Sequence, residues 1–146
     1  MPNSGIDYEG HMMSHRSSGP DLTRVAPRSP WARLGYFSVA ARVLDKCRAE
    51  IAGTNGEYDF NCPLDRLFFG FAGISAIEFR QFVSTGADDA EVARWLNERA
   101  QAGDAKRALW NGLALIHPGF ILMRLDDWMH ARRARGQRRN RSAEHG

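Results

Sequence analysis

The sequence predicts an all-α protein that folds as a compact single-domain bundle of about six helices of mixed length. Three observations support this fold class. Apolar residues recur at helical spacing in several segments, capping residues precede those segments, and no segment alternates convincingly between apolar and polar side chains. With 146 residues, of which 43% are hydrophobic, the chain is about one domain long and can bury a core.

The chain divides into three parts by composition. Residues 1–20 are rich in Ser, Gly, His and Met without apolar periodicity, so they are predicted to be a disordered arm. Residues 21–131 form the predicted all-α domain, and residues 132–146 form an arginine-rich tail. The tail holds six of the 20 basic residues and one of the 17 acidic residues, which leaves 14 basic and 16 acidic residues elsewhere. The net charge of +3 therefore comes from the tail, and the body is close to neutral.

The first predicted helix is short and begins at Ser29-Pro30, after an extended lead-in. A serine hydroxyl can cap a helix, and proline is favoured at the first helical position. Gly35 weakens this helix because glycine disfavours helix interiors.

The strongest predicted helix runs from about Ser38 to Ala52. One apolar stripe recurs every four residues, at Val39, Val43, Cys47 and Ile51. Gly53 stands where a helix-terminating glycine belongs, and Thr54-Asn55-Gly56 predicts a turn. Pro63 then predicts another short helix, capped by Asn61 or Cys62.

Four further helices follow from capping signals and from proline. Ser75 with Glu78 and Asp88 with Glu91 have the spacing of capping boxes, so each pair predicts a helix start. Helical spacing predicts another helix over residues 105–116. His117-Pro118 interrupts it, and the last predicted helix begins at Pro118.

Polar side chains of many kinds crowd one segment, and they form the candidate binding site. Its residues are Arg42, Asp45, Lys46, Arg48, Tyr58, Asn61, Cys62 and Asp65. One interpretation is an anion-binding surface, because arginine binds phosphates and carboxylates through a planar fork. The other is a solvated helix face, with ion pairs between Arg42 and Asp45, Asp45 and Arg48, and Lys46 and Glu50. A buried pair between Asp65 and Arg48 fits the structural interpretation.

The two cysteines have different predicted roles. Cys47 lies on the apolar stripe and is predicted to be a core residue. Cys62 precedes Pro63 at a predicted helix N-terminus, where backbone amides stabilise a thiolate. An alternative function is therefore a small enzyme with Cys62 as nucleophile, assisted by Asp65 or His117. A buried thiol that fixes a structural corner is the other interpretation.

No cofactor and no metal site are predicted. Asp126 and His130 stand four residues apart on one helix, which can present two metal ligands, and His117 could add a third. Arginines lie nearby in the sequence, at Arg124, Arg132 and Arg133. Asp126 and Asp127 therefore have a simpler predicted role as salt-bridge partners of these arginines. The sequence contains no C-x-x-C, H-E-x-x-H or glycine-rich phosphate loop.

The tail gives a third functional hypothesis. Its arginines are Arg132, Arg133, Arg135, Arg138, Arg139 and Arg141. Such a run can bind nucleic acid without sequence preference, or it can act as a solubilising end. The sequence shows no secretory signal, no apolar run long enough for a membrane span, and only two cysteines, so a cytoplasmic protein without membrane contact is predicted.

Motifs at Asp21-Leu22, at Pro27 to Pro30, between Asp45 and Asp65 and at Asp126-Asp127 resemble those of one family. It is a family of small bacterial proteins known as domain of unknown function 5069, and the similarity runs from Asp21 to about Trp128. The family's opening motifs match Asp21-Leu22 and Pro27-Arg28-Ser29-Pro30. Its middle motif matches best, at Asp45, Lys46, Arg48, Gly56, Tyr58, Asn61, Cys62, Pro63 and Asp65. A C-terminal acidic pair matches at Asp126-Asp127. The resemblance implies a standalone unit and brings no known activity, substrate or cofactor.

The main functional prediction is a non-enzymatic binding or interaction module. Its expected partner is a small anion or an acidic protein segment, bound at the polar residues between Arg42 and Asp65. The Cys62 enzyme and the nucleic-acid-binding tail remain the alternatives.

Overall fold

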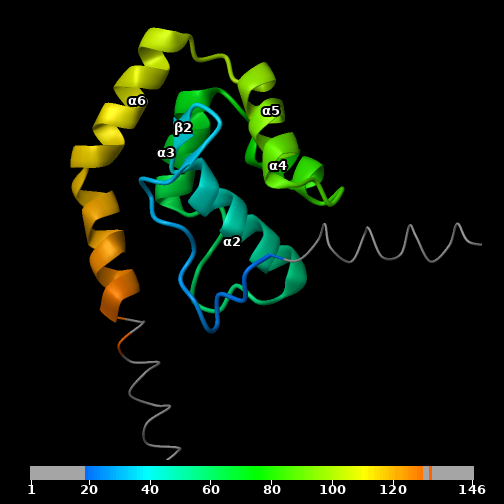
Figure 1. Cartoon of the computed structure of the whole chain (residues 1–146), viewed down its shortest axis with the longest axis vertical. Coiled ribbons are helices and arrows are strands. Elements are labelled where there is room, and N and C mark those ends of the chain that lie inside the picture. The colour runs from blue at the N-terminus through cyan, green and yellow to red at the C-terminus, as the bar shows by residue number, and fades with distance from the viewer. Residues whose placement is uncertain (1–18, 130–131, 133–146) are drawn as a thin grey trace, which may run out of the picture.

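The computed structural model describes residues 19–129 and residue 132. Within these residues the chain forms one small hairpin and six helices (Figure 1). The elements are β1 (Arg33–Leu34), β2 (Phe37–Ser38), α2 (Ala40–Ala52), α3 (Pro63–Ala72), α4 (Ala76–Val83), α5 (Asp89–Arg99), α6 (Asp104–Ile116) and a helix over Pro118–Met129. The predicted mostly helical fold is confirmed. The predictions for residues 1–18 and 133–146, and for His130, lie outside the described residues.

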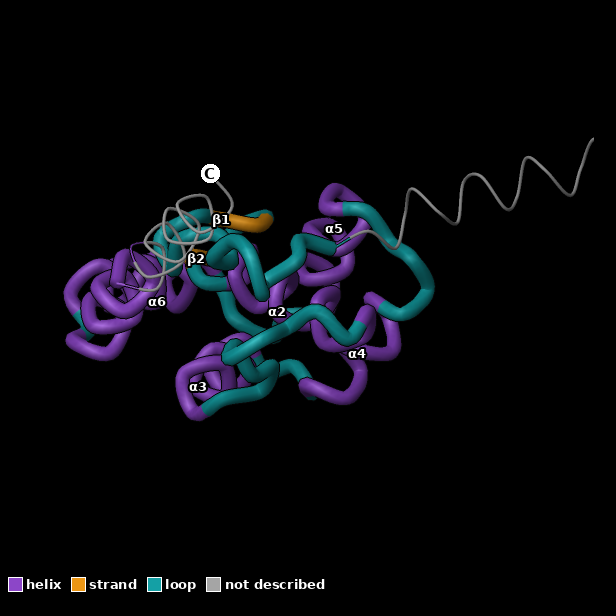
Figure 2. The backbone as a smooth tube through the Cα atoms, turned by 90° about the horizontal axis from the view of Figure 1, so that it is seen from below, coloured by secondary structure: helices purple, strands orange, loops and turns teal. Residues whose placement is uncertain are grey.

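Helix α2 lies at the centre, with the other elements arranged around it (Figure 2). Nine of its 13 residues are buried, including Arg42, Asp45 and Lys46. Of the predicted stripe, Val39, Val43 and Cys47 are at most 1% exposed, as expected. The prediction is wrong for Ile51, which is 41% exposed because it lies in the last turn of α2. Since α2 is covered on several sides, its buried surface is wider than one apolar stripe and includes charged residues.

The predicted short helix at Ser29-Pro30 is wrong. Residues 33–38 instead form an antiparallel hairpin in which Arg33 pairs with Ser38 and Leu34 pairs with Phe37. Gly35 has a φ of 59°, so it supplies the left-handed conformation that the two-residue turn requires. Strands of two residues are too short to show alternation in the sequence.

The predicted helix ends are mostly confirmed. Gly53 ends α2 with a φ of 73°. Ser75 accepts a hydrogen bond from the Glu78 amide at the start of α4, and Asp88 with Glu91 forms a complete capping box on α5. Cys62 occupies the N-cap position of α3, but its side chain makes no capping hydrogen bond.

Aromatic side chains connect the elements through the core. The ring of Phe68 on α3 lies 5.8 Å from Phe37, 5.3 Å from Phe69 and 5.9 Å from Trp110, measured between centroids. Phe68 itself is fully buried. It therefore packs α3 against both the hairpin and α6.

Helix α6 satisfies the free edge of β2 with side chains. Trp110 Nε1 donates to the Ser38 carbonyl at 2.9 Å, and Asn111 Oδ1 accepts from the Ser38 amide at 2.8 Å. Asn111 Nδ2 also donates to the Tyr36 carbonyl at 2.9 Å. These bonds fix α6 beside the hairpin without a third strand.

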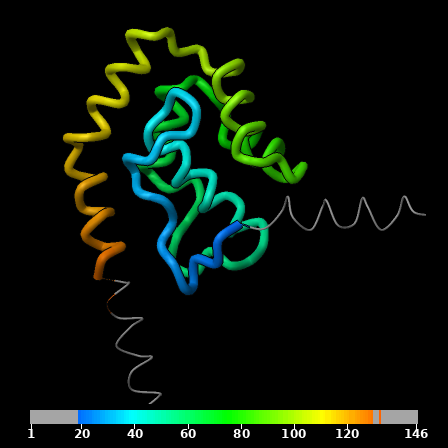
Figure 3. Tube along the Cα trace, in the orientation of Figure 1, coloured from blue at the N-terminus to red at the C-terminus, as the bar shows by residue number. Residues whose placement is uncertain are grey.

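The last two described helices form an outer arm along one flank of the molecule (Figures 1 and 3). They are bent by 51° at the break between Ile116 and Pro118. Of the helices that the structure describes, none alone is long and apolar enough to cross a membrane. This bent pair meets the criteria of length and composition only when its two helices are taken together.

Replacing Phe68 with alanine should lower the free energy of unfolding by about 3–5 kcal/mol, because it removes the ring that joins three elements and leaves a cavity. Urea denaturation followed by circular dichroism measures this change. The control is Leu67→Ala next to it, where the side chain is 44% exposed and the expected loss is below about 1 kcal/mol. Equal losses in the two variants would contradict the role of Phe68.

Candidate functional site

Arg42 lies inside the protein and forms an ion pair with Asp127 from the Pro118–Met129 helix. Nη1 donates to Asp127 Oδ2 at 2.7 Å and Nη2 donates to Oδ1 at 3.0 Å. Both side chains are 3% exposed. The Tyr58 hydroxyl donates to the same carboxylate at 3.1 Å, and burial together with the charge of Asp127 raises the pKa of Tyr58. This pair therefore anchors the last described helix to α2.

Lys46 ties α2 to the start of α3. Its Nζ donates to Asp65 Oδ1 at 2.7 Å, to the Asp59 carbonyl at 3.0 Å and to Cys62 Sγ at 3.3 Å. The second Asp65 oxygen accepts from the Asn61 amide at 2.9 Å. All three ammonium donors are thus used inside the protein.

Two further pairs tie α2 to the lead-in segment and to α5. Asp45 accepts from the Arg28 amide at 2.8 Å and from Arg28 Nη2 at 3.0 Å. Arg48 donates to Asp89 at 2.7 Å and to the Ala87 carbonyl at 2.9 Å. Arg28 also reaches Asp89, at 2.8 Å. Burial opposes the charged form of Asp89, but the bonds from Arg48 and Arg28 hold its pKa below the usual value.

We call these four α2 residues and their partners the α2 charge cluster. It consists of Arg42, Asp45, Lys46 and Arg48 on α2, with Asp127, Arg28, Asp65 and Asp89 as partners. The pairs expected within α2 are therefore wrong, and so is the pair between Asp65 and Arg48. Glu50 likewise pairs with Arg80 of α4 rather than with Lys46. Because α2 lies inside the fold, its charged side chains meet facing elements instead of their neighbours along a solvated surface.

The structure places the eight predicted site residues in three groups around α2. These are Lys46 with Asn61, Cys62 and Asp65; Arg42 with Tyr58; and Asp45 with Arg48, which are linked through Arg28 and Asp89. Each of the three α2 cations already has a carboxylate partner. Anion binding by these residues stays a prediction.

The two cysteines lie in different surroundings. Cys47 is fully buried, and burial raises its pKa to about 12. Cys62 is half-buried beside the Lys46 ammonium. His117 Nδ1 accepts from the Gly119 amide at 3.1 Å, and no hydrogen bond links His117 to Cys62 among the described residues.

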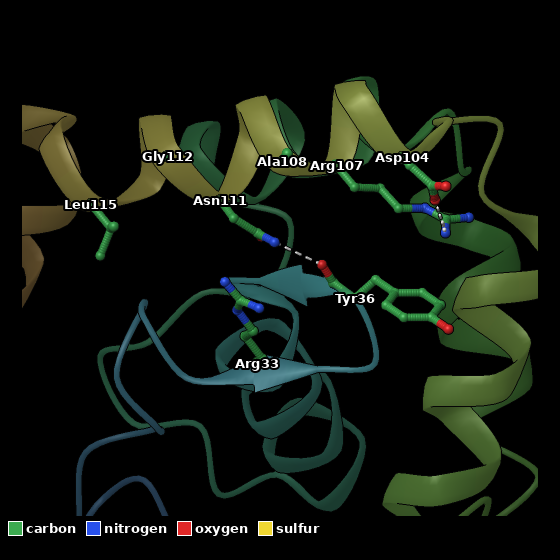
Figure 4. Close-up of a pocket in the computed structure, with 8 residues that line it drawn as sticks. All are labelled: Arg33, Tyr36, Asp104, Arg107, Ala108, Asn111, Gly112 and Leu115. Carbon is green, nitrogen blue, oxygen red and sulfur yellow. Dashed lines mark hydrogen bonds and ion pairs between the residues drawn. The ribbon is translucent and has the colours of Figure 1, made fainter.

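A pocket of about 370 Å³ opens between the hairpin and α6 (Figure 4). We call it the hairpin pocket. Its lining residues are Arg33, Tyr36, Asp104, Arg107, Ala108, Asn111, Gly112 and Leu115. Arg33 enters from β1 and Arg107 from the facing helix, so two cations from separate elements border one space (Figure 4).

The two arginines of the hairpin pocket are less completely paired than those of the α2 charge cluster. Among the described residues, none forms an ion pair with Arg33. Arg107 makes one long contact of 3.4 Å to Asp104, whose side chain is fully exposed. Its Nε is buried without a hydrogen-bond partner, as is Arg42 Nε, so the difference between the two sets lies in their carboxylate contacts. The Arg107 guanidinium lies over the Tyr36 ring, 4.9 Å from the centroid, which holds it in place.

The sequence does not reveal the hairpin pocket, because Ser29-Pro30 predicts a short helix where the structure has the lead-in to the hairpin. One signal was present: Arg33 and Tyr36 flank Gly35 in a short R-L-G-Y-F stretch, which suits a turn as well as a helix. No sequence signal relates Arg33 to Arg107, which lies more than seventy residues further along the chain.

Comparison with known protein families shows which family the chain belongs to. The family described as "Domain of unknown function (DUF5069)" matches residues 24–118. The chain belongs to this family. The match contains the hairpin, α2 to α6 and every lining residue of the hairpin pocket. No curated protein matches the sequence. Within the described residues of this family member, no group of three or more potential ligands is placed to hold a metal ion.

Removing one member of the Arg42–Asp127 pair should strongly destabilise the protein, because the other charge stays buried without a partner. Arg42→Met and Asp127→Leu should each cost about 3–5 kcal/mol of unfolding free energy, whereas the double variant should cost less than the sum. Urea denaturation of all three variants measures the coupling. Arg24→Met, in a pair whose side chains are 74% and 42% exposed, is the control and should cost less than about 1 kcal/mol. Additive losses would show that the two side chains do not interact.

The two thiols should react at different rates in the folded protein. Iodoacetamide at pH 8 should label Cys62 at least tenfold faster than Cys47, because a buried thiol with a pKa near 12 is both inaccessible and protonated. Peptide mass spectrometry at timed intervals measures each rate, and Cys62→Ser supplies the control. Similar rates for both thiols would contradict the difference in burial.

Proposed function

We propose that the protein is a non-enzymatic binding module that recognises a small anionic group in the hairpin pocket. The observation that carries the proposal is that Arg33 and Arg107, from two separate elements, both line one pocket, without a carboxylate that fully pairs either. Guanidinium groups bind phosphate and carboxylate oxygens with paired, charge-assisted hydrogen bonds. A free small anion and a carboxylate on an acidic protein segment share this chemistry.

The comparison between the two sets of arginines supports this location. In the α2 charge cluster, Arg42 and Arg48 each donate to a carboxylate at 2.7 Å. An added anion would have to displace those carboxylates. At the hairpin pocket an anion would instead add partners to groups that have few, so the electrostatic gain is larger.

The pocket is also built firmly enough to hold a ligand. Asn111 and Trp110 hydrogen-bond α6 to the hairpin, so the two walls are joined to each other. Arg107 is only 18% exposed and stacks against Tyr36. Fixed walls reduce the loss of side-chain freedom when a ligand binds.

The enzyme with a Cys62 nucleophile is a second candidate, and one observation favours it. The Lys46 ammonium lies 3.3 Å from Cys62 Sγ, and a neighbouring cation stabilises a thiolate. Rapid labelling of Cys62 is the measurement that bears on this candidate. Nucleic-acid binding through the tail stays a prediction, since Arg132 alone of its arginines is described.

Titration with inorganic phosphate and pyrophosphate, followed by ¹⁵N chemical shifts, tests anion recognition. Saturable shifts should centre on the hairpin and the first two turns of α6. Arg33→Gln should weaken binding at least tenfold, which corresponds to about 1.4 kcal/mol. Asp104→Asn should strengthen it, because the variant removes the one acid in the pocket.

The matched control is Arg94→Gln, which removes an exposed arginine on α5 next to Glu91 and Glu98. This variant should bind phosphate as the unmodified protein does. Equal weakening by Arg33→Gln and Arg94→Gln would reduce the effect to net charge and refute the proposal. So would the absence of any saturable shift with either anion.

A further inference from the structure

The outer surface of α6 is unusually apolar. Three large residues on it are between 40% and 70% exposed: Leu109, Leu113 and Ile116. The inner side of the same helix already buries Trp110 and Ala114. Helix α6 is therefore apolar on both sides, a pattern typical of helices that are covered all round.

The Pro118–Met129 helix repeats this arrangement. Its outer surface carries Ile121, Leu122, Leu125, Trp128 and Met129, which are 42% to 63% exposed. Its inner side is occupied by Phe120 and Asp127, both at most 3% exposed. The exposed residues follow the spacing i, i+4 and i+7, so they share one side of the helix.

We call the exposed apolar residues on the outer sides of these two consecutive helices the outer face. Within the described residues it consists of eight large side chains on two consecutive helices. Nothing in the described part of the chain covers it, because the inner sides of both helices are already packed against the body. A patch of this extent on a folded protein marks an interaction surface.

Charge and size indicate which partner suits the outer face. Residues 104–129 contain three acids and three basic residues, so this arm is neutral and selects neither an anionic nor a cationic surface. Lys106 lies over the Phe71 ring, at 5.2 Å, on the inner side. Because the arm carries no net charge, two copies of the outer face can approach each other without electrostatic repulsion. Eight half-exposed side chains amount to on the order of 800 Å², comparable with the area that each partner contributes to a standard interface.

We propose that the outer face binds the outer face of a second copy of this chain, forming a two-fold symmetric dimer. In such a dimer the same residues serve both partners, so a single self-complementary patch closes the assembly. The interface would be dominated by aliphatic side chains with Trp128 near one end, as in stable homodimers.

Sedimentation equilibrium of the full chain over a range of concentrations tests the dimer. The mass should reach twice 16.4 kDa. Leu122→Glu should raise the dimer dissociation constant at least tenfold, because it places a charge inside an apolar interface. Leu122→Ser is the milder companion variant, and unchanged circular dichroism in either one shows that the fold is intact.

Ile77→Glu on α4 is the matched control, since Ile77 is 70% exposed and lies away from the outer face. It should dimerise as the unmodified protein does. A monomer at all concentrations would overturn the proposal, as would a dimer that is equally stable with Leu122→Glu. If a monomer instead sediments with phosphatidylserine vesicles, and Leu122→Glu abolishes this, the partner is a lipid surface and the dimer is refuted.

Discussion

The fold depends on one electrostatic constraint: the charges that α2 carries into the interior must each meet a partner. Removing a charged group from water costs several kcal/mol unless an opposite charge and hydrogen bonds replace the water. Arg42, Asp45 and Lys46 are at most 5% exposed, and each is met by a different segment. The α2 charge cluster thus specifies which elements surround α2 and in which position. Apolar packing alone, which is not directional, would tolerate more arrangements.

The sequence was sufficient to predict what depends on local chemistry. The capping residues Ser75 and Asp88 and the terminating glycine after α2 act within a few residues, so their roles were predicted correctly. The hairpin was not, because Pro30 is compatible with a turn as well as with a helix start. The partners of the charges on α2 could not be predicted either. The Arg42–Asp127 pair joins residues 85 positions apart, and nothing in the spacing along α2 reveals that the helix is buried.

The difference between local chemistry and contacts between distant residues also explains which parts of the candidate site the sequence could predict. The polar residues between Arg42 and Asp65 are dense in the sequence, and in the structure most of them form ion pairs and hydrogen bonds that hold the elements together. The hairpin pocket was overlooked because its two arginines, Arg33 and Arg107, are ordinary when considered separately. What distinguishes them is incomplete pairing, a property that exists only in three dimensions. In this fold the dense group of charges holds the elements together, whereas the sparsely paired Arg33 and Arg107 are the basis of the proposed anion site.

The position of Asp127 also bears on where this domain ends. The family match stops at residue 118, within the first turn of the last described helix. Yet the partner of the buried Arg42 lies nine residues beyond that point, and Phe120 fills part of the core. A chain shortened to the matched region would leave a guanidinium inside the protein with no counter-ion. The smallest self-sufficient folding unit therefore extends at least to Asp127, and the terminal helix is part of the domain rather than an appendage to it.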